Sequence, residues 1–301
     1  MASGTIEAVR GHWPEYLIEA AGLALFMISA GAFGTLLEYP QSPVRGVLPD
    51  PLVRRALMGI AMGATAIGLI YSPWGRQSGA HFNPAVTLAF SRLGKVAPWD
   101  GVFYVIAQFV GGLAGVLAIS AVLGNAFRRP PVGFVVTVPG SAGPLIAFLS
   151  EFAISCGLML AVLYTSNRIH LMRYTGLFAG ALLAGYVTVE APFSGTSMNP
   201  ARTVASAAPS GVWDGVWIYF SAPLLGMLIA VDAYRLLTGR TGVICAKLNH
   251  ITRRRCIFRN CGFKEHAIDV PLLVERRSRS NAGAQAFDRV RSCRWRANVM
   301  T

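Results

Sequence analysis

The sequence predicts an all-α membrane protein with six transmembrane helices and two half-membrane re-entrant helices, arranged as an inverted repeat. Three observations lead to this prediction. Apolar residues make up 53% of the 301 residues and charged residues only 14%, against about 25% charged in soluble domains. Six apolar stretches are long enough to cross a bilayer. Two shorter apolar stretches open with the same three residues, Asn-Pro-Ala, at matching positions of the two halves.

The six long stretches are nearly free of charge and have about the twenty residues needed to cross a bilayer core of about 30 Å. Gly, Ala and Ser are frequent within them, as expected where helices approach closely in lipid. An N-terminal segment at 1–15 precedes them, and a tail at 239–301 follows. The membrane domain, 16–238, has halves at about 16–124 and 145–238. The expected spans are 16–38, 52–72, 101–124, 145–166, 174–191 and 215–238.

The net charge of +13 belongs mainly to the tail. Of the 27 Lys and Arg residues, 14 lie in residues 239–301, and the rest of the chain carries 13 basic and 10 acidic residues. A basic tail on an apolar protein gives no reason to expect nucleic-acid binding, and it favours contact with anionic lipid headgroups. Basic segments are retained in the cytoplasm, so we expect a multi-pass protein of the inner cell membrane with both termini cytoplasmic.

The two short apolar stretches, about 83–92 and 199–208, predict helices that enter the membrane and return. Each begins with Asn as an N-cap and Pro at the first helical position, which is a helix start signal. Ser78–Val86 aligns with Ser194–Arg202 without gaps as Ser-Gly-x-x-x-Asn-Pro-Ala, 116 residues further on. Because each half has three spans, the second half must insert with opposite polarity. Such inverted repeats point to a binding or conduction site at the midplane.

Two half-helices that meet at the midplane can repel cations without a charged side chain. Their N-termini expose unpaired N–H groups and the positive ends of two helix dipoles. We expect the side-chain oxygens of Asn83 and Asn199 to cap their own helices, with their NH₂ groups facing the lumen, where they interrupt a proton-conducting chain of water. The pore residues expected at this point are Asn83, Pro84, Ala85, Asn199, Pro200 and Ala201.

Arg202 follows the second Asn-Pro-Ala within an otherwise apolar region. A charge at this depth is costly, so the default interpretation is a functional residue on an aqueous path. A fixed guanidinium at a narrow point would repel cations and offer donors to solutes. The alternative is a side chain that snorkels to the membrane interface.

These motifs resemble those of the major intrinsic protein family, the aquaporins and glycerol facilitators, and suggest a bacterial-type member. The resemblance covers about residues 15–238 and includes the two signature loops, Glu19, Glu151 and the third-span motif Tyr104–Gln108. It implies a passive channel for water or small neutral solutes that excludes protons and ions. It implies no enzymatic activity and no cofactor. It also implies a homotetramer with one pore per subunit.

The resemblance further implies a selectivity filter of four residues. An apparent insertion at residues 72–77 leaves the second-span position open, with Met58 and Gly63 as alternatives to Met62. Val187 stands where water-selective members carry histidine, so we expect a wider or more apolar filter that is not restricted to water. The expected filter residues are Arg202, Thr196, Val187 and Met62.

Four polar residues are expected to support the pore. Glu19 and Glu151 occupy matching positions in the first span of each half, and we expect them to accept hydrogen bonds from the loops that hold the half-helices rather than to carry protons. His81 corresponds to a loop histidine of the family and is expected to make a structural hydrogen bond, with gating as the alternative. Gln108 is expected to tie a span to the first half-helix.

The tail carries four candidate metal ligands with the spacing Cys-x4-His-x5-Cys-x4-Cys, which matches no common zinc finger. They could close a structural zinc site in a reducing cytoplasm. The alternative is free thiols beside the membrane, with acylation at Cys245. The distal stretch 276–296 lacks apolar periodicity and is expected to be disordered. The four candidate ligands are Cys245, His250, Cys256 and Cys261.

Two other functions fit parts of the same pattern. A secondary transporter also uses inverted repeats, but it needs an ion or proton site, and besides Arg202 only Glu19 and Glu151 lie well inside spans. A non-conducting scaffold would share the fold and carry no flux. The expected partners are therefore water, small neutral solutes of about glycerol size, membrane lipids and other copies of the chain.

Overall fold

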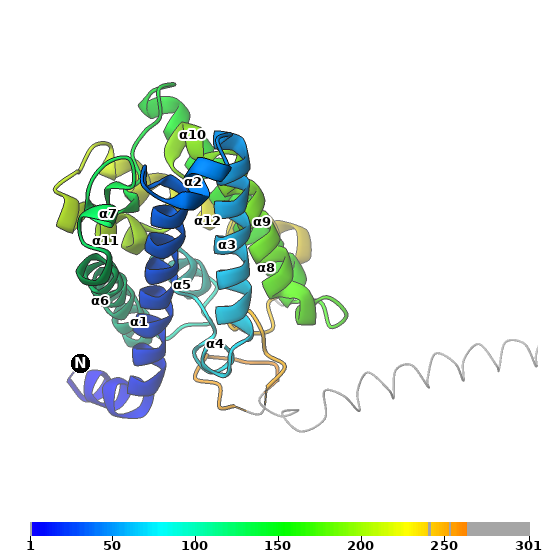
Figure 1. The fold of residues 1–301 in the computed structure, drawn as a ribbon. Helices are drawn as coiled ribbons and strands as arrows, with labels where there is room; N and C mark the ends of the chain where they lie inside the picture. The colour runs from blue at the N-terminus through cyan, green and yellow to red at the C-terminus, as the bar shows by residue number, and fades with distance from the viewer. Residues whose placement is uncertain (1, 240–241, 253, 264–301) are drawn as a thin grey trace, which may run out of the picture. The chain divides into compact units, whose positions relative to one another are not determined.

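The computed structural model describes residues 2–239, 242–252 and 254–263, and every regular element in this part of the chain is a helix (Figure 1). Residues from Met1 to Cys261 form one compact unit. The sequence separated the tail from the membrane domain at residue 239, whereas the structure packs residues 242–252 and 254–261 against the helices. The predicted disorder of residues 276–296 lies outside the described residues.

Six helices correspond to the six expected spans, and two shorter ones to the expected half-helices. Most begin at a proline, whose fixed φ and missing N–H suit the first helical position. The six are α1 (Ala2–Glu38), α3 (Pro51–Tyr71), α6 (Pro98–Leu123), α8 (Pro144–Ser166), α9 (Thr175–Val189) and α12 (Val216–Thr238); the half-helices are α5 (Pro84–Arg92) and α11 (Pro200–Ser210). Short helices lie between them: α2 (Pro43–Val47), α4 (Pro73–Ser78), α7 (Asn125–Arg128), η1 (Gly133–Val135), η2 (Met172–Tyr174) and α10 (Ala191–Ser194).

The expected spans and the observed helices differ at two places. Five of the described helices are long and apolar enough to cross a membrane, and α9, with 15 residues, is too short by the same criterion. Its ends are continued by the short helices η2 and α10. At the other place, α1 begins at Ala2 and not near residue 16. Its first turns run at an angle to the rest (Figure 1), and Pro14 inside the helix removes one backbone hydrogen bond.

The helix pairs repeat between the halves. The most extensive contacts join α1 with α6 in the first half, α8 with α12 in the second, and α3 with α9 between the halves. Because α3 and α9 are the second spans of their halves, the inverted repeat exchanges the two helices and so maps their contact onto itself. Apolar side chains on the outer faces are exposed, as suits helices in lipid: Ile60 61%, Val110 62%, Val122 78% and Leu145 69%.

Glycines allow the paired helices to approach closely. A Cβ atom on Gly111 of α6 would lie 2.0 Å from the carbonyl oxygen of Ala20 in α1. A Cβ atom on Gly63 of α3 would lie 2.4 Å from the carbonyl oxygen of Gly180 in α9. In both cases the obstacle is backbone of the partner helix, so neither site has room for a side chain at the present helix separation.

We predict that Gly111→Ala destabilises the protein, because a methyl group there forces α1 and α6 apart; overpacking of this kind costs about 1–3 kcal/mol. The matched control is Gly68→Ala in α3, where an added Cβ meets nothing within 4 Å. The measurement is the unfolding temperature of each variant in detergent micelles. Equal unfolding temperatures for the two variants would contradict the close α1–α6 packing.

Candidate functional site: a pore

The N-termini of α5 and α11 meet and are joined by two reciprocal hydrogen bonds. Asn83 Oδ1 accepts from the backbone N–H of Ala85 at 2.8 Å and so caps α5, while its Nδ2 donates to the carbonyl oxygen of Met198 at 2.7 Å. In the other half, Asn199 Nδ2 donates to the carbonyl oxygen of Phe82 at 2.8 Å. Each asparagine thus caps its own helix and binds the loop of the other half.

The second cap has the same form. Asn199 Oδ1 accepts from the backbone N–H groups of Ala201 at 3.0 Å and Arg202 at 3.3 Å. Pro84 and Pro200 are the first residues of the two half-helices. The sequence placed both NH₂ donors of each asparagine toward the lumen, whereas in the structure one N–H of each binds a carbonyl oxygen of the other half. An NH₂ group has two donors, which leaves one on each side chain for a solute.

The loops before the half-helices share an uncommon backbone conformation. Ala80 and Phe82 have φ of 59° and 47°, and their counterparts Thr196 and Met198 have φ of 53° and 52°. Residues with a side chain rarely adopt this left-handed region. Such a conformation persists only where the surroundings fix it, and here it turns successive backbone N–H groups toward one side of each loop.

Glu19 and Glu151 accept those N–H groups. Glu19 of α1 is fully buried and accepts from the backbone N–H groups of His81 at 3.1 Å and Phe82 at 2.6 Å. Glu151 of α8 is also fully buried and accepts from those of Ser197 at 2.6 Å and Met198 at 2.7 Å. The two carboxylates therefore occupy the structural position that the sequence suggested for them.

A tyrosine and a serine complete each loop. Ser78 donates through Oγ to Glu19, and Ser194 donates to Glu151, both at 2.7 Å. The Tyr104 hydroxyl donates to the carbonyl oxygen of Ser78, and the Tyr219 hydroxyl to that of Ser194, both at 2.6 Å. The sequence analysis missed Tyr219. The spacing could have identified it, because Tyr104 follows Ser78 by 26 residues and Tyr219 follows Ser194 by 25.

His81 and Gln108 also contact the first loop. Gln108 Nε2 donates to Glu19 Oε2 at 2.8 Å and to Thr87 Oγ1 of α5 at 3.1 Å, which ties α6 to the half-helix. His81 Nδ1 lies 3.2 Å from Thr87 Oγ1. Its Nε2 donates to the carbonyl oxygen of Ala246 at 2.9 Å, so the imidazole joins the half-helix to the chain beyond α12.

Two cavities lie on either side of the meeting point. The tail-side cavity, about 120 Å³, is lined by Asn83, Asn199, His81 and, from the chain beyond α12, Leu248. The far-side cavity, about 260 Å³, is lined by residues from the opposite ends of the helices, among them Glu38 at the end of α1 and Arg55 near the start of α3. The two share the lining residues Phe26, Leu183, Ser197 and Arg202, so they meet at these side chains.

All four residues expected at the filter line the far-side cavity: Arg202, Thr196, Val187 and Met62. Of the alternatives to Met62, Met58 lines the same cavity, whereas Gly63 packs against α9. Arg202 lies where the two cavities meet, and its buried Nη1 has no hydrogen-bond partner among the described residues. This location differs from the snorkelling alternative, and the Arg202 side chain as a whole is half-buried where it lines both cavities.

The sequence analysis missed Glu190, which follows α9 and is 7% exposed. Glu190 accepts a hydrogen bond from the Thr196 hydroxyl group and also contacts the Ser194 hydroxyl group, whose single proton is shared between Glu190 and Glu151. The Thr196 hydroxyl is therefore committed to Glu190. In the sequence, Glu190 is only an acidic residue at the end of a predicted span. Such residues are common at span ends, so this position did not indicate a role in the pore.

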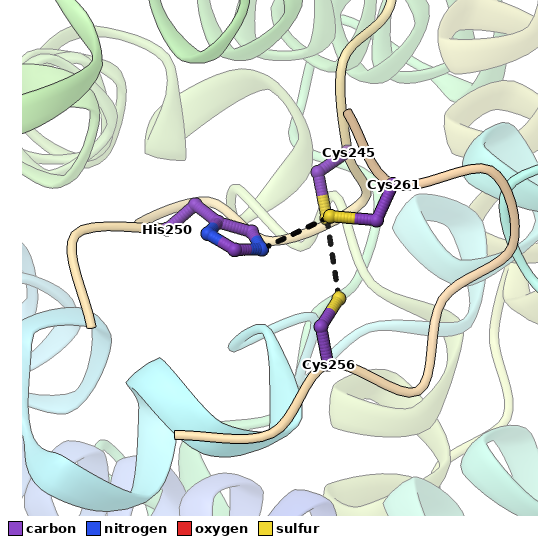
Figure 2. A group of neighbouring side chains, drawn as sticks. All are labelled: Cys245, His250, Cys256 and Cys261. Atoms are coloured by element: carbon purple, nitrogen blue, oxygen red, sulfur yellow. Dashed lines mark hydrogen bonds between the residues drawn. The ribbon is translucent and has the colours of Figure 1, made fainter. Parts of the chain in front are cut away.

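The four tail ligands converge, although they come from separate stretches of an irregular loop (Figure 2). Cys245 Sγ lies 3.6 Å from Cys256 Sγ, and Cys261 Sγ lies 3.2 Å from His250 Nε2. All four ligand atoms lie within 4.8 Å of one another. Burial and the neighbouring thiols raise the pKa of the Cys245 thiol. The spacing in sequence identified the four residues correctly as a group.

An inverted repeat with two half-helices that meet head to head, each held by a buried glutamate, defines a class of multi-pass membrane proteins with a central pore. A profile described as "Major intrinsic protein" matches residues 9–234. The chain belongs to the major intrinsic protein family. The expected fold class, the family and a multi-pass membrane location are thereby confirmed, while the bacterial subtype, the particular membrane and the orientation of the termini stay predictions.

Curated relatives and a solved structure agree with this assignment. Aquaporin NIP1-3 of Oryza sativa subsp. japonica is 39% identical over 182 residues, covering 59% of this chain and 60% of the relative. Aquaporin NIP4-1 of the same plant is 34% identical over 218 residues, covering 71% and 70%. Aquaporin A of Dictyostelium discoideum is 35% identical over 197 residues, covering 64% and 69%. The chain spans about three fifths of the length of the first relatives that it matches.

The X-ray structure of the aquaglyceroporin from Plasmodium falciparum has the same fold, with a TM-score of 0.60. It is 17% identical in sequence, and the match covers 74% of this chain and 96% of that one.

We predict that Glu151→Gln loosens the second loop. The amide NH₂ group is a donor, so it cannot accept one of the two hydrogen bonds that the Glu151 carboxylate accepts from backbone N–H groups. A buried donor left without a partner costs about 1–3 kcal/mol. The measurement is hydrogen exchange at the backbone amides of Ser197 and Met198, which should become faster, together with a lower unfolding temperature. The control is Glu7→Gln on the exposed face of α1. Unchanged exchange in Glu151→Gln would show that the carboxylate does not hold the loop.

Proposed function

We propose that the protein is a passive channel for water and small neutral solutes. The observation that carries this proposal is the meeting of the two half-helix N-termini between two cavities that share Arg202. Relatives with matching sequence are named aquaporins, and the matching structure is named an aquaglyceroporin. The proposed function needs one pore through the chain and no cofactor for conduction.

Exclusion of ions follows from the charges at the meeting point. Each half-helix presents about half a positive charge at its N-terminus, and the Arg202 guanidinium adds a full charge beside them. Cations and hydronium are repelled by all three. A water molecule at the centre accepts the remaining N–H donors of Asn83 and Asn199, which turns its own hydrogens away from the centre and breaks the proton-conducting chain.

The filter supports passage of solutes larger than water. Met62 and Val187 present apolar surface, and the Thr196 hydroxyl is committed to Glu190. Donors to a solute at this point are therefore supplied mainly by the Arg202 guanidinium, which is half-buried and lines both cavities. A site with few donors and apolar walls favours neutral solutes of about the size of glycerol together with water.

The alternative functions receive less support. An alternating-access transporter needs an ion or proton site near the midplane, and the two buried glutamates there are already occupied by loop hydrogen bonds. A scaffold without flux would not need a guanidinium group where two cavities meet, and we therefore favour the channel.

We propose the inner cell membrane as the location, with the tail side in the cytoplasm. The supporting observation is the concentration of basic residues in residues 239–301, which are retained on the cytoplasmic side and contact anionic lipid headgroups. We also propose a homotetramer. Its support is membership of the family together with exposed apolar side chains, which face either lipid or neighbouring subunits.

We propose that the four tail ligands hold a structural zinc ion, which takes no part in conduction itself. In a tetrahedral site with Zn–S bonds of about 2.3 Å and a Zn–N bond of about 2.0–2.1 Å, ligand atoms lie about 3.5–3.8 Å apart. The observed separations of 3.6 Å and 3.2 Å are close to this geometry. Three thiolates and one imidazole are a ligand set typical of structural zinc.

The channel proposal is tested by osmotic shrinkage of liposomes that contain the full-length protein. Shrinkage should be faster than in protein-free liposomes, with a low activation energy and no saturation by solute. The assay is run on zinc-loaded and zinc-free preparations. Shrinkage at the protein-free rate in both would refute the channel proposal.

We predict that Val187→His lowers glycerol flux several-fold and water flux much less, because imidazole adds bulk and polar groups to the far-side cavity. The measurement is the ratio of the two fluxes in the liposome assay. Val189→His is the control, since Val189 lies at the end of the same helix and its side chain is 70% exposed. An unchanged ratio in Val187→His would show that Val187 does not belong to the filter.

A further inference from the structure

The zinc ligands lie on a segment, residues 242–261, that packs at the tail-side end of the pore. Figure 1 shows this segment, in orange, at the same end of the bundle as α4 and the N-terminal turns of α1. Apart from residue 253, its residues are described, and they form no helix or strand. Its shape therefore depends on contacts with the helices and on links within the segment.

Three residues of the segment contact the pore directly. Leu248 is 6% exposed and lines the tail-side cavity, and its backbone N–H donates to the carbonyl oxygen of Gly79 at 3.1 Å. The carbonyl oxygen of Ala246 accepts from His81 Nε2. The Phe258 ring stacks on the His81 ring with centroids 5.4 Å apart. The segment thus supplies part of the cavity wall and covers the loop that leads to Asn83.

The segment is also fastened to both halves of the pore domain. Ile244 N–H donates to Asn167 Oδ1, just after α8, at 2.6 Å, while Lys95, just after α5, donates through Nζ to the carbonyl oxygen of Ile244 at 3.3 Å. Arg255 binds Glu15 of α1, whose side chain is fully buried. These contacts hold the segment that contains Leu248 against elements of both halves.

Further contacts bury the one lysine of the segment. Lys247 is 2% exposed, and its Nζ donates to the carbonyl oxygens of Arg76 at 2.9 Å and Arg255 at 2.7 Å. A buried ammonium is costly unless its donors are bound, so the segment must hold a defined shape for Lys247 to be satisfied. The four ligands enclose this residue in sequence, and a metal ion between them would fix that shape.

We propose that residues 242–261 form a lid over the tail-side mouth of the pore and that zinc bound by Cys245, His250, Cys256 and Cys261 keeps the lid closed. Loss of zinc frees the irregular segment, withdraws Leu248 from the cavity wall and raises the flux. This proposal rests on the proposed channel function. Zinc availability would then set the permeability of the membrane.

The test compares zinc-loaded and zinc-free full-length protein in liposomes, with zinc or a membrane-permeant chelator added to both faces. We expect one zinc ion per chain, slow osmotic shrinkage with zinc, and shrinkage several-fold faster without it. Hydrogen exchange of the backbone amides of residues 242–261 should accelerate on chelation. Absence of bound zinc, or equal flux and equal exchange in the two states, would overturn the lid.

Matched variants separate the lid from other effects of zinc. Cys256→Ser with Cys261→Ser should give fast shrinkage that zinc does not slow. Cys156→Ser, which removes a cysteine of α8 outside the cluster, should keep the full response to zinc. Continued slowing by zinc in the ligand variant would place its action elsewhere and overturn the proposal.

A third variant distinguishes failure of the lid from failure of the channel. Leu248→Ala keeps the four ligands and shortens the side chain in the cavity wall. It should bind zinc as the wild type does and conduct faster in the zinc-loaded state. If wild type conducts equally with and without zinc, the channel stands and the lid is refuted. If neither state of wild type nor Leu248→Ala conducts, the channel proposal fails, and the lid fails with it.

Discussion

A helix that begins in the middle of a membrane exposes backbone N–H groups where no bulk water can satisfy them. Two such helix starts meet in this protein, and the rest of the pore is built around them. Asn83 and Asn199 cap the starts and bind each other's loops. Each loop passes through left-handed conformations, which turn its backbone N–H groups toward one side. These buried N–H groups need an acceptor beside the loop. Glu19 and Glu151 are those acceptors.

The sequence predicted the parts of this arrangement that are local. Asn-Pro-Ala marks a helix start by itself, and its repetition within Ser-Gly-x-x-x-Asn-Pro-Ala placed both half-helices within two residues of their observed ends. Apolar length placed the spans, and the paired glutamates were recognised from their matching positions. In contrast, the helical N-terminal segment was missed, because residues 2–15 are too polar to be recognised by hydropathy.

Contacts between residues far apart in the sequence were harder to predict. Tyr219 and Glu190 complete the second loop only because α12 and the end of α9 lie beside it, and neither residue belongs to a local motif. The four tail ligands were grouped by their spacing, yet the contact of their segment with the pore joins Ala246 to His81 across 165 residues. Nothing in the periodicity of an irregular segment indicates which surface it covers, so the lid could be recognised only in the structure.

The repeat also explains why the two mouths differ. His81 and Ser197 occupy matching positions of the two halves. The Ser197 hydroxyl lies 2.6 Å from Thr203 Oγ1 in its own half. The His81 ring makes the equivalent contact to Thr87 with one nitrogen and binds Ala246 with the other. At another pair, Arg202 lies where the two cavities meet, and Val86 lines the tail-side cavity. The first half thus has an apolar wall and an extra donor facing the tail. A segment with an apolar side chain and a free carbonyl oxygen fits there, and Leu248 and Ala246 supply both.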